Sequence, residues 1–138
     1  MGRLKYLLDT NVCIHFIKNE IKVVHKIEDV DLENCYLSEM TILELIYGIS
    51  NSQSARKAEN IEKFKEFEYL FKERILPIRP SFEEFSSQKT RLRKLGTPIG
   101  DFDLLIGCTA LVNNLILASR NIKEMNRIEG LKLENWID

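Results

Sequence analysis

Four short apolar runs are separated along the chain by longer segments in which apolar residues recur at helical spacing. The runs occupy residues 5–8, 35–38, 75–78 and 115–118, and LKLENW near the end supplies a short fifth. Helices are expected over residues 10–17, 21–30, 40–49, 55–74, 82–95 and about 102–112, the fifth of them ended by Gly96. Alternating strands and helices predict an α/β fold with a mostly parallel central sheet of four to five short strands, flanked by helices.

The bulk composition is that of an ordinary globular domain. A chain of 138 residues with 44% hydrophobic and 30% charged residues is expected to form one domain, residues 1–138. The three cysteines are widely spaced without a C-x-x-C motif, and two histidines are too few for a zinc site. A reducing cytoplasm is therefore the expected compartment. No apolar run approaches the ~20 residues of a membrane-spanning helix, so we expect no membrane association.

Acidic or amide side chains stand inside or at the ends of strongly apolar segments. They are Asp9, Glu44, Asp103 and Asn121. In parallel α/β sheets, sites form outside the carboxyl ends of the strands, and all four residues map to that edge. Oxygen-only pockets suit hard divalent cations. The pattern therefore points to metal-dependent phosphodiester chemistry.

Each of these residues also has a purely structural interpretation. Asp9 precedes a helix and could cap it, and Asn11 is either another cap or a partner that orients Asp9. Glu44 could be a solvated helical residue, although its apolar neighbours leave little polar face for it. Asn121 could be no more than a turn or cap residue.

Asp101 and Asp103 both stand near the start of the last long helix, where negative charge suits the helix dipole. One is expected to be a first-turn acid and the other a ligand, and the residues alone do not rank them. Small residues such as Gly107 are expected to let this helix pack closely on the sheet. The hydroxyl of Ser119 could hold a metal-bound water. No His/Asp partner supports it as a nucleophile, so serine hydrolase chemistry is not expected.

The charge distribution singles out one basic cluster. A net charge of −1 argues against a strong general nucleic-acid binder. Residues 51–95, however, contain 11 Lys or Arg against 7 Asp or Glu. Mixed charge on an exposed helix is usually only solvation. The part best suited to meet phosphates is the KTRLRK segment, with Lys89, Arg91, Arg93 and Lys94.

Four runs carry a more specific signal: YLLDTNVCIHFIKN, SEMTILELIYGI, GTPIGDFDLLIGCTALVNNLILASRN and EGLKLENW. In order and spacing they resemble the PIN-domain family, and within it the VapC-type toxin ribonucleases of type II toxin–antitoxin modules. The resemblance covers both ends and the centre of the chain, and residues 51–79 carry little of it.

The resemblance implies a role for each acid. Asp9 matches the family's first acid, at the end of the first strand, and Glu44 the second, in the helix after the second strand. Asp103 matches the third, because the family pattern is I-G-x-x-D followed by an apolar helix, so Asp101 is at best accessory. Asn121 matches a fourth position that is Asp in many PIN domains and often Asn in these toxins.

The resemblance further implies a Mg²⁺- or Mn²⁺-dependent endoribonuclease. Asp9, Glu44 and Asp103 would hold the metal, directly or through waters, with Asn121 assisting. The implied substrate is structured RNA, such as initiator tRNA, whose cleavage inhibits translation, and the basic cluster would contact its backbone. The implied partners are a second copy in a homodimer and a cognate VapB-type antitoxin, which covers the acidic pocket with a basic side chain.

Two other functions remain open on the residues. One is a non-catalytic PIN-like module that binds RNA or protein. The other is a signalling receiver-type α/β domain with an acidic magnesium pocket. A receiver needs paired acids after the first strand and a lysine after the last, whereas Asp9 is followed by Thr10 and Asn11 and no such lysine pattern is visible.

Overall fold

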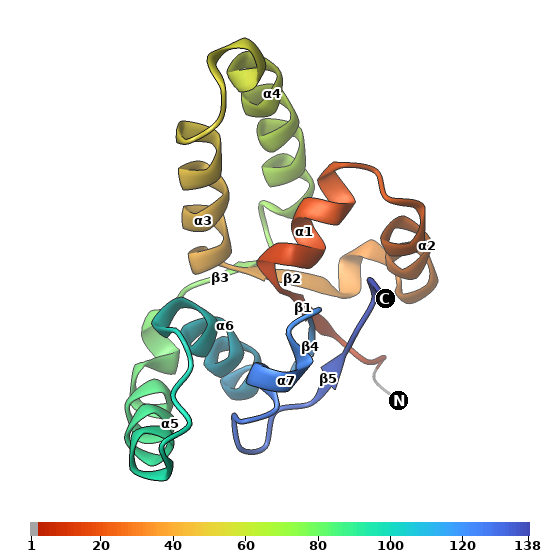
Figure 1. Ribbon diagram of the computed structural model, residues 1–138. Helices are drawn as coiled ribbons and strands as arrows, with labels where there is room; N and C mark the ends of the chain where they lie inside the picture. Colours follow the sequence, from red (N-terminus) through yellow and green to blue (C-terminus); the bar gives the residue numbers. More distant parts are fainter. Residues whose placement is uncertain (1–2) are drawn as a thin grey trace.

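In the computed structural model, which describes residues 3–138, one sheet of five parallel strands is covered by helices on both faces (Figure 1). The first two residues of the expected domain lie outside the described range. The elements in chain order are β1 (Tyr6–Leu8), α1 (Thr10–Ile17), α2 (Ile21–Val30), η1 (Leu32–Asn34), β2 (Cys35–Ser38), α3 (Glu39–Ser50), α4 (Ser54–Phe71), β3 (Ile75–Leu76), η2 (Arg79–Ser81), α5 (Phe82–Leu95), α6 (Asp101–Val112), β4 (Ile116–Ala118), α7 (Ile122–Met125) and β5 (Leu133–Glu134).

The expected α/β architecture is confirmed, with strand order β3-β2-β1-β4-β5. The differences are two element ends and one additional short helix. Strand β3 has only two residues, since Pro77 follows it and offers no N–H to a neighbouring strand. Helix α4 ends at Phe71 rather than at residue 74, and Arg74 instead donates from Nε to the carbonyl of Cys35 at 3.0 Å. The four-residue helix α7 was not expected, because it is shorter than one hydrophobic period can reveal.

The central strand divides the core into two halves. Successive side chains of a strand point to opposite faces. Tyr6 and Leu8 accordingly pack on one face with α1, α2 and α4, whereas Leu7 packs on the other with α5, α6 and α7. Figure 1 shows the same division, with α1 and α2 on one side of the sheet and α5 and α6 on the other.

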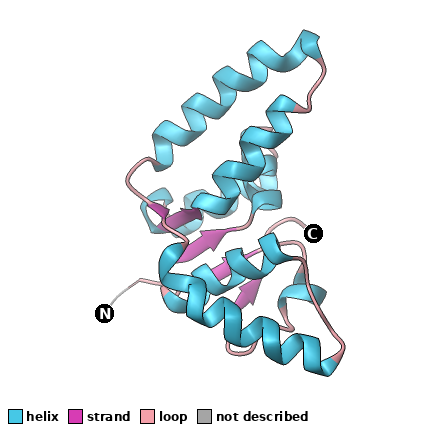
Figure 2. Ribbon diagram, turned by 90° about the vertical axis from the view of Figure 1, so that its left-hand side faces the viewer, coloured by secondary structure: helices cyan, strands magenta, loops and turns pink. Residues whose placement is uncertain are grey.

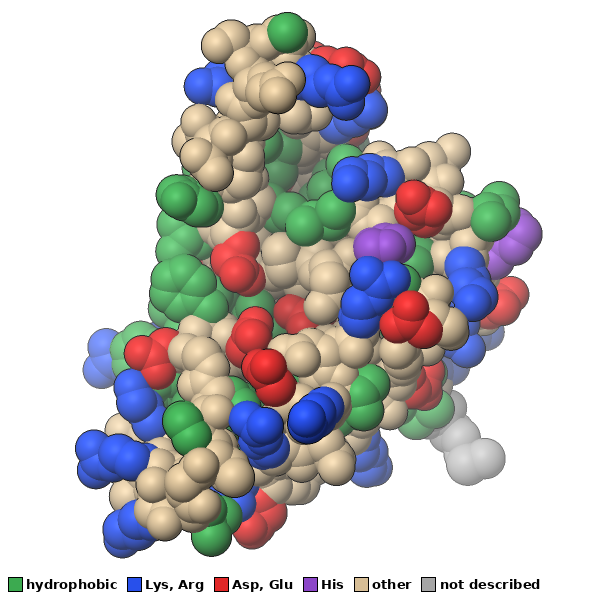
Figure 3. Space-filling model, in the orientation of Figure 1, with side chains coloured by type: hydrophobic (Ala, Val, Ile, Leu, Met, Phe, Trp, Pro, Cys, Tyr) green, Lys and Arg blue, Asp and Glu red, His purple; other side chains and the backbone are tan. Residues whose placement is uncertain are grey.

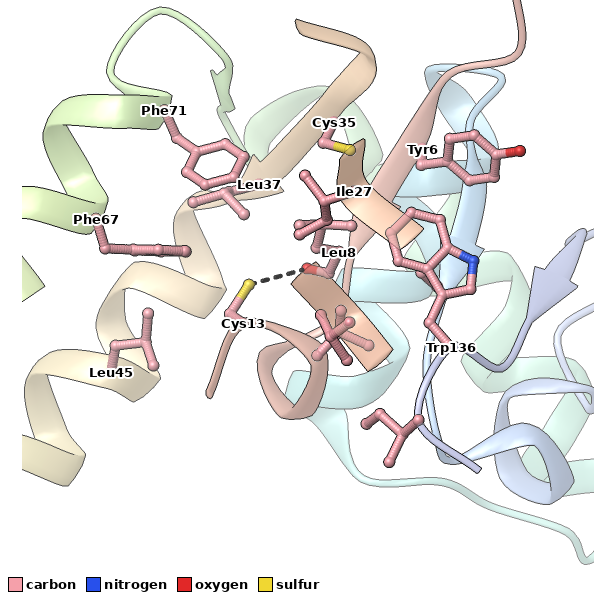
Figure 4. Close-up of a cluster of buried hydrophobic side chains, with 14 residues drawn as sticks. Tyr6, Leu8, Cys13, Ile27, Cys35, Leu37, Leu45, Phe67, Phe71 and Trp136 are labelled. Atoms are coloured by element: carbon pink, nitrogen blue, oxygen red, sulfur yellow. Dashed lines mark hydrogen bonds between the residues drawn. The ribbon is translucent and has the colours of Figure 1, made fainter. Parts of the chain in front are cut away.

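An aromatic cluster fixes α1 and α4 on the first face (Figure 4). The rings of Phe67 and Phe71, labelled in Figure 4, have centroids 4.9 Å apart. Phe16 of α1 packs against both. Full burial of such a side chain contributes roughly 1.5–3 kcal/mol. The Cys13 thiol donates to the carbonyl of Leu8 at 3.7 Å, which ties α1 to the end of β1. This packing holds the start of α1 against the edge of the sheet where the polar residues gather.

Helices α3 and α4 run side by side as a hairpin that stands out from the sheet (Figure 2).

All three cysteines are buried free thiols. Among residues 3–138, none of the helices is long and apolar enough to cross a membrane.

The close approach expected at Gly107 is made to a different neighbour. A Cβ added there would collide with Ile128 Cδ1 and would come within 3.6 Å of Met125. The absent side chain therefore makes room for α7 and the loop after it, rather than for the sheet. That packing brings α7 beside the first half of α6.

Candidate active site

Asp9 follows β1 directly, and its carboxylate is held from two sides. The residue is 3% exposed. The backbone N–H of Thr10 donates to Asp9 Oδ1 at 2.8 Å, and the Ser119 hydroxyl donates to Oδ2 at 2.6 Å. Burial raises the pKa of Asp9 and so does nearby Glu44, whereas the two hydrogen bonds act to lower it. Asp9 is thus both the expected N-cap of α1 and an oriented buried acid.

The loop after β4 supplies the side chain that orients Asp9. Besides donating to Asp9, the buried Ser119 hydroxyl accepts from the backbone N–H of Asn121 at 2.9 Å. Asn11 has another role, since its Oδ1 accepts from the backbone N–H of Arg120 at 3.2 Å. Among residues 3–138, the Asp9 carboxylate accepts hydrogen bonds from the Thr10 backbone N–H and the Ser119 hydroxyl. Ser119, rather than Asn11, therefore orients the acid, and Asn11 secures the loop.

Glu44 reaches the same region from the first turns of α3. Its Oε1 accepts a hydrogen bond of 2.6 Å from the Thr10 hydroxyl, which links α3 to the start of α1. Glu44 is half-buried. Glu44 is therefore partly exposed, and one of its carboxylate oxygens is held by a partner from another helix.

Asp103 stands in the first turn of α6 and faces the other acids. Its pKa is raised to about 6, first by burial and then by the charges of Asp9, Glu44 and Glu124. The side-chain amide of Asn121 lies 3.5 Å from Asp103 Oδ2. The expected convergence of these residues is present. Three carboxylates and one amide, drawn from four places in the chain, share one electrostatic environment.

Glu124 was not singled out from the sequence. It lies on α7, accepts a hydrogen bond of 3.3 Å from Asn121 Nδ2, and raises the pKa of Asp103. The feature of the sequence that could have identified Glu124 is its position three residues, about one helical turn, after Asn121. It also stands next to Met125, which is buried. The charge that Asn121 does not carry is thus supplied one turn further along the chain.

Acidic side chains gather in the middle of one face of the molecule, where α1, α3, α6 and α7 meet (Figure 3). The chemistry of this donor set fits Mg²⁺ or Mn²⁺, because every donor is oxygen and neighbouring acidic charges raise the pKa of Asp9 and of Asp103. Among residues 3–138, no three His, Cys, Asp or Glu side chains are grouped so that all could hold one ion. A bound ion would therefore have fewer than three direct carboxylate contacts in this arrangement and would keep several waters, as Mg²⁺ commonly does.

Asp101 does not join this cluster. Its carboxylate forms an ion pair of 2.8 Å with Lys89, and both side chains are at least half exposed. The pair connects α6 to α5 beside the acidic site. Asp101 therefore sets where the Lys89 ammonium lies.

The remaining cations of the basic cluster differ in their surroundings. Arg91 is turned inward, where it donates to the carbonyl of Arg127 and to Gln88 Oε1 and lies 3.7 Å from Glu129. Arg93 and Lys94 are exposed in the last turn of α5. Neither forms an ion pair within the described part of the chain. These two side chains are free to meet a phosphate, and Arg91 is engaged in packing.

A groove of about 490 Å³ leads from Glu44 along the α3–α4 hairpin. Its floor is largely apolar, and cationic side chains stand on its rim. The apolar lining residues are Ile14, Ile17, Leu45, Ile49 and Phe64, and the cations are Lys18, Arg56 and Lys63.

The PIN domain family model matches residues 6–131. The chain is 31% identical over 134 residues to a protein from Shigella flexneri named tRNA(fMet)-specific endonuclease VapC, covering 96% of this chain and 98% of that protein. It is 34% identical over 136 residues to ribonuclease VapC2 of Haemophilus influenzae, covering 97% and 99%. A solved VapBC2 complex from Rickettsia felis, bound to a DNA fragment from its promoter, matches with a TM-score of 0.87 and 32% identity over 97% of this chain and 100% of that one.

With this fold and these acids, the chain belongs to the PIN-domain family. Within the family its relatives are the VapC toxin ribonucleases, and the chain is an endoribonuclease of that kind. This membership excludes the receiver-type alternative.

Proposed function

We propose that this chain is a single PIN domain over residues 1–138 that cleaves structured RNA as the toxin of a VapBC-type module in the cytoplasm. The observation that carries the proposal is the convergence of Asp9, Glu44 and Asp103 from three elements at one edge of the sheet. Burial and, after it, the neighbouring acidic charges raise the pKa of Asp103 to about 6. Repulsion between the carboxylates lowers the stability of the metal-free protein, and a bound cation relieves this repulsion.

The ion would be Mg²⁺ or Mn²⁺, held by Asp9, Glu44 and Asp103 directly or through waters, with Asn121 and Glu124 assisting. When bound, it would lower the pKa of water and offset negative charge at the phosphate. The protein's own side chains orient the site. Ser119 and the Thr10 N–H fix the Asp9 carboxylate, and the Asn121 amide spans Asp103 and Glu124.

We propose structured RNA as the substrate and tRNA as the first candidate to test. The Shigella relative is named for initiator tRNA, and cleavage of that molecule would inhibit translation. Arg93 and Lys94 would contact the RNA backbone, with Lys89 beside them, and such contacts position the substrate rather than read its sequence.

The partner we propose is a VapB-type antitoxin, as in the Rickettsia felis VapBC2 complex. The groove beside Glu44 suits it, since apolar antitoxin side chains would cover the floor and acidic ones would meet Lys18, Arg56 or Lys63. A basic antitoxin side chain would reach the acidic cluster. We also propose a homodimer, formed through the exposed apolar side chains of Leu43, Tyr47 and Phe102.

The test is cleavage of total bacterial RNA by the purified, antitoxin-free protein in Mg²⁺, in Mn²⁺ and in EDTA, with the cut ends mapped. Asp9→Asn keeps a capping side chain and removes one charge, so we expect the protein to fold and the cleavage rate to fall roughly 10²–10⁴-fold, the usual range for losing one such group. Asp103→Asn should behave alike.

Asp29→Asn, the same change on the exposed surface of α2, is the control and should cut as the wild type does. Equal cutting by all variants, or cutting in EDTA, would reject the site. A folded wild-type protein that binds RNA without cutting it under any condition would support the non-catalytic binding module instead.

A further inference from the structure

Thr10 contacts both of the first two acids of the site. Its backbone N–H donates to Asp9 Oδ1 at 2.8 Å, and its side-chain hydroxyl donates to Glu44 Oε1 at 2.6 Å. Asp9 follows β1, and Glu44 lies on α3. One residue therefore sets the separation of two carboxylates that are 35 positions apart in the chain.

A second threonine contacts the Thr10 hydroxyl. Thr41, on α3 and fully buried, places its Oγ1 3.1 Å from Thr10 Oγ1. The Thr10 hydroxyl donates to Glu44 Oε1, and that bond uses its single proton. The Thr10 oxygen is then left to accept from Thr41. The order of donation is Thr41 to Thr10 to Glu44.

These hydrogen bonds leave one carboxylate oxygen of Glu44 with a partner and the other without one. Oε1 is engaged by Thr10, whereas Oε2 accepts no hydrogen bond from residues 3–138. We propose that Thr10, itself held by Thr41, is the positioning residue of Glu44 and reserves Oε2 as the single oxygen offered to a cation. This inference rests on the proposed role of Glu44 in metal binding.

The physical reason lies in the freedom of a glutamate side chain. An unheld Glu has several rotamers, and fixing one of them upon metal binding costs entropy. A β-branched threonine is stiff at χ1, so its hydroxyl is a well-placed anchor. Partners that orient a metal ligand typically account for about 10–100-fold in metal affinity. The hydrogen bond between Thr10 and Glu44 is expected to act in that way.

The experiment measures Mn²⁺ affinity by calorimetry and Mn²⁺ electron paramagnetic resonance in the full-length protein. Thr10→Val keeps the shape and the backbone N–H but removes the hydroxyl, and should weaken Mn²⁺ binding about 10-fold or more. Thr10→Ser restores the hydroxyl and should recover most of the affinity. Thr41→Val should give a smaller loss, because Thr10 keeps its bond to Glu44.

The deciding comparison repeats Thr10→Val in a Glu44→Gln background. Residues that act through one another show non-additive effects. Once the carboxylate is gone, removal of the Thr10 hydroxyl should change Mn²⁺ affinity little. Thr109→Val is the control, since it makes the same change away from Glu44, at a fully buried threonine whose hydroxyl donates to the carbonyl of Leu105. It should lower thermal stability without changing Mn²⁺ affinity.

The outcomes separate this inference from the proposed function. If Glu44→Gln binds Mn²⁺ as tightly as the wild type, the metal site itself is wrong. If Glu44→Gln weakens binding but Thr10→Val does not, only the positioning role fails. Equal losses from Thr10→Val in both backgrounds would also overturn it, because the effect would not pass through Glu44. If Thr10→Val does not fold, Thr41→Val and Thr10→Ala decide by the same comparison.

Discussion

Asp103 bears the clearest electrostatic cost among the residues of the site. Its carboxyl is half-buried at the start of α6 and faces three other acids, which together with burial raise its pKa to about 6. In the unfolded chain the same carboxyl titrates near its ordinary value of 3.8. The folded protein therefore holds this proton more tightly than the unfolded chain does, and stability must depend on pH.

The direction of this pH dependence follows from the tighter binding of the proton by the folded state. The contribution of Asp103 to stability is fully present below pH 3.8 and is lost as the pH rises through about 6. At pH 7.5 in EDTA, Asp103→Asn should be more stable than the wild type by roughly 1–2 kcal/mol, since each pKa unit is worth about 1.4 kcal/mol and partial exposure screens some of it. The difference should shrink towards pH 4.

Urea unfolding at both pH values measures this. Mn²⁺ should stabilise the wild type and have little effect on the variant. An Asp103→Asn protein that is less stable than the wild type at pH 7.5 in EDTA would show that the carboxylate is not under repulsion.

At the scale of elements, α5 is attached to the rest of the molecule by polar side chains as well as by buried Leu92. Gln88 donates to the carbonyl of Glu129, and Arg91 donates to the carbonyl of Arg127. Both contacts reach the segment between α7 and β5, which lies beside the acidic site. The helix ends at Gly96, whose φ of 72° suits a residue without Cβ. Arg93 and Lys94 project from its last turn.

Two variants of α5 should therefore differ in what they lose, one in stability and the other in RNA binding. Arg91→Gln removes charged hydrogen bonds and should destabilise the protein by about 1–2 kcal/mol, measured by thermal unfolding. Arg93→Gln combined with Lys94→Gln should leave stability unchanged, weaken RNA binding, and reduce the salt dependence of binding by up to about two phosphate contacts. Weaker RNA binding by Arg91→Gln at unchanged stability would show that Arg91 reaches the RNA.

At the scale of the whole molecule, one edge carries an apolar surface. Leu43 and Phe102 are 50% exposed and Tyr47 is 68% exposed, and together with Glu44 they line one open pocket. Figure 3 shows apolar side chains along this edge, over α3. Contiguous exposed apolar surface commonly marks an interface. Its position beside Glu44 means that a second copy bound there would border the acidic site.

The wild-type protein is accordingly expected to be a dimer, and Tyr47→Glu should convert it to a folded monomer by burying a charge in the interface. Light scattering after size exclusion measures the mass, and circular dichroism checks the fold. Tyr69→Glu is the control, because Tyr69 is also 68% exposed but lies on α4. A wild-type monomer, or dissociation by Tyr69→Glu alone, would contradict this interface.

The sequence-based predictions succeed where the signal is local. The strands near residues 6, 35 and 116, the six longer helices and the end at Gly96 follow from apolar spacing and backbone chemistry within a few residues. The placement of the acids at one edge also follows, since parallel strands deliver their carboxyl ends together. The choice of Asp103 over Asp101 did not come from this chemistry and required resemblance to a family.

The amino-acid sequence by itself determined the α/β class, the order of strands and helices, and the set of acids at the sheet edge, because these depend on short-range periodicity. Only the tertiary structure decided which side chains serve those acids. Ser119 reaches Asp9 across 110 positions, Thr10 reaches Glu44 across 34, and Glu124 joins the cluster through a helix of four residues. Such partners are chosen by packing in three dimensions, which no local pattern in the chain records.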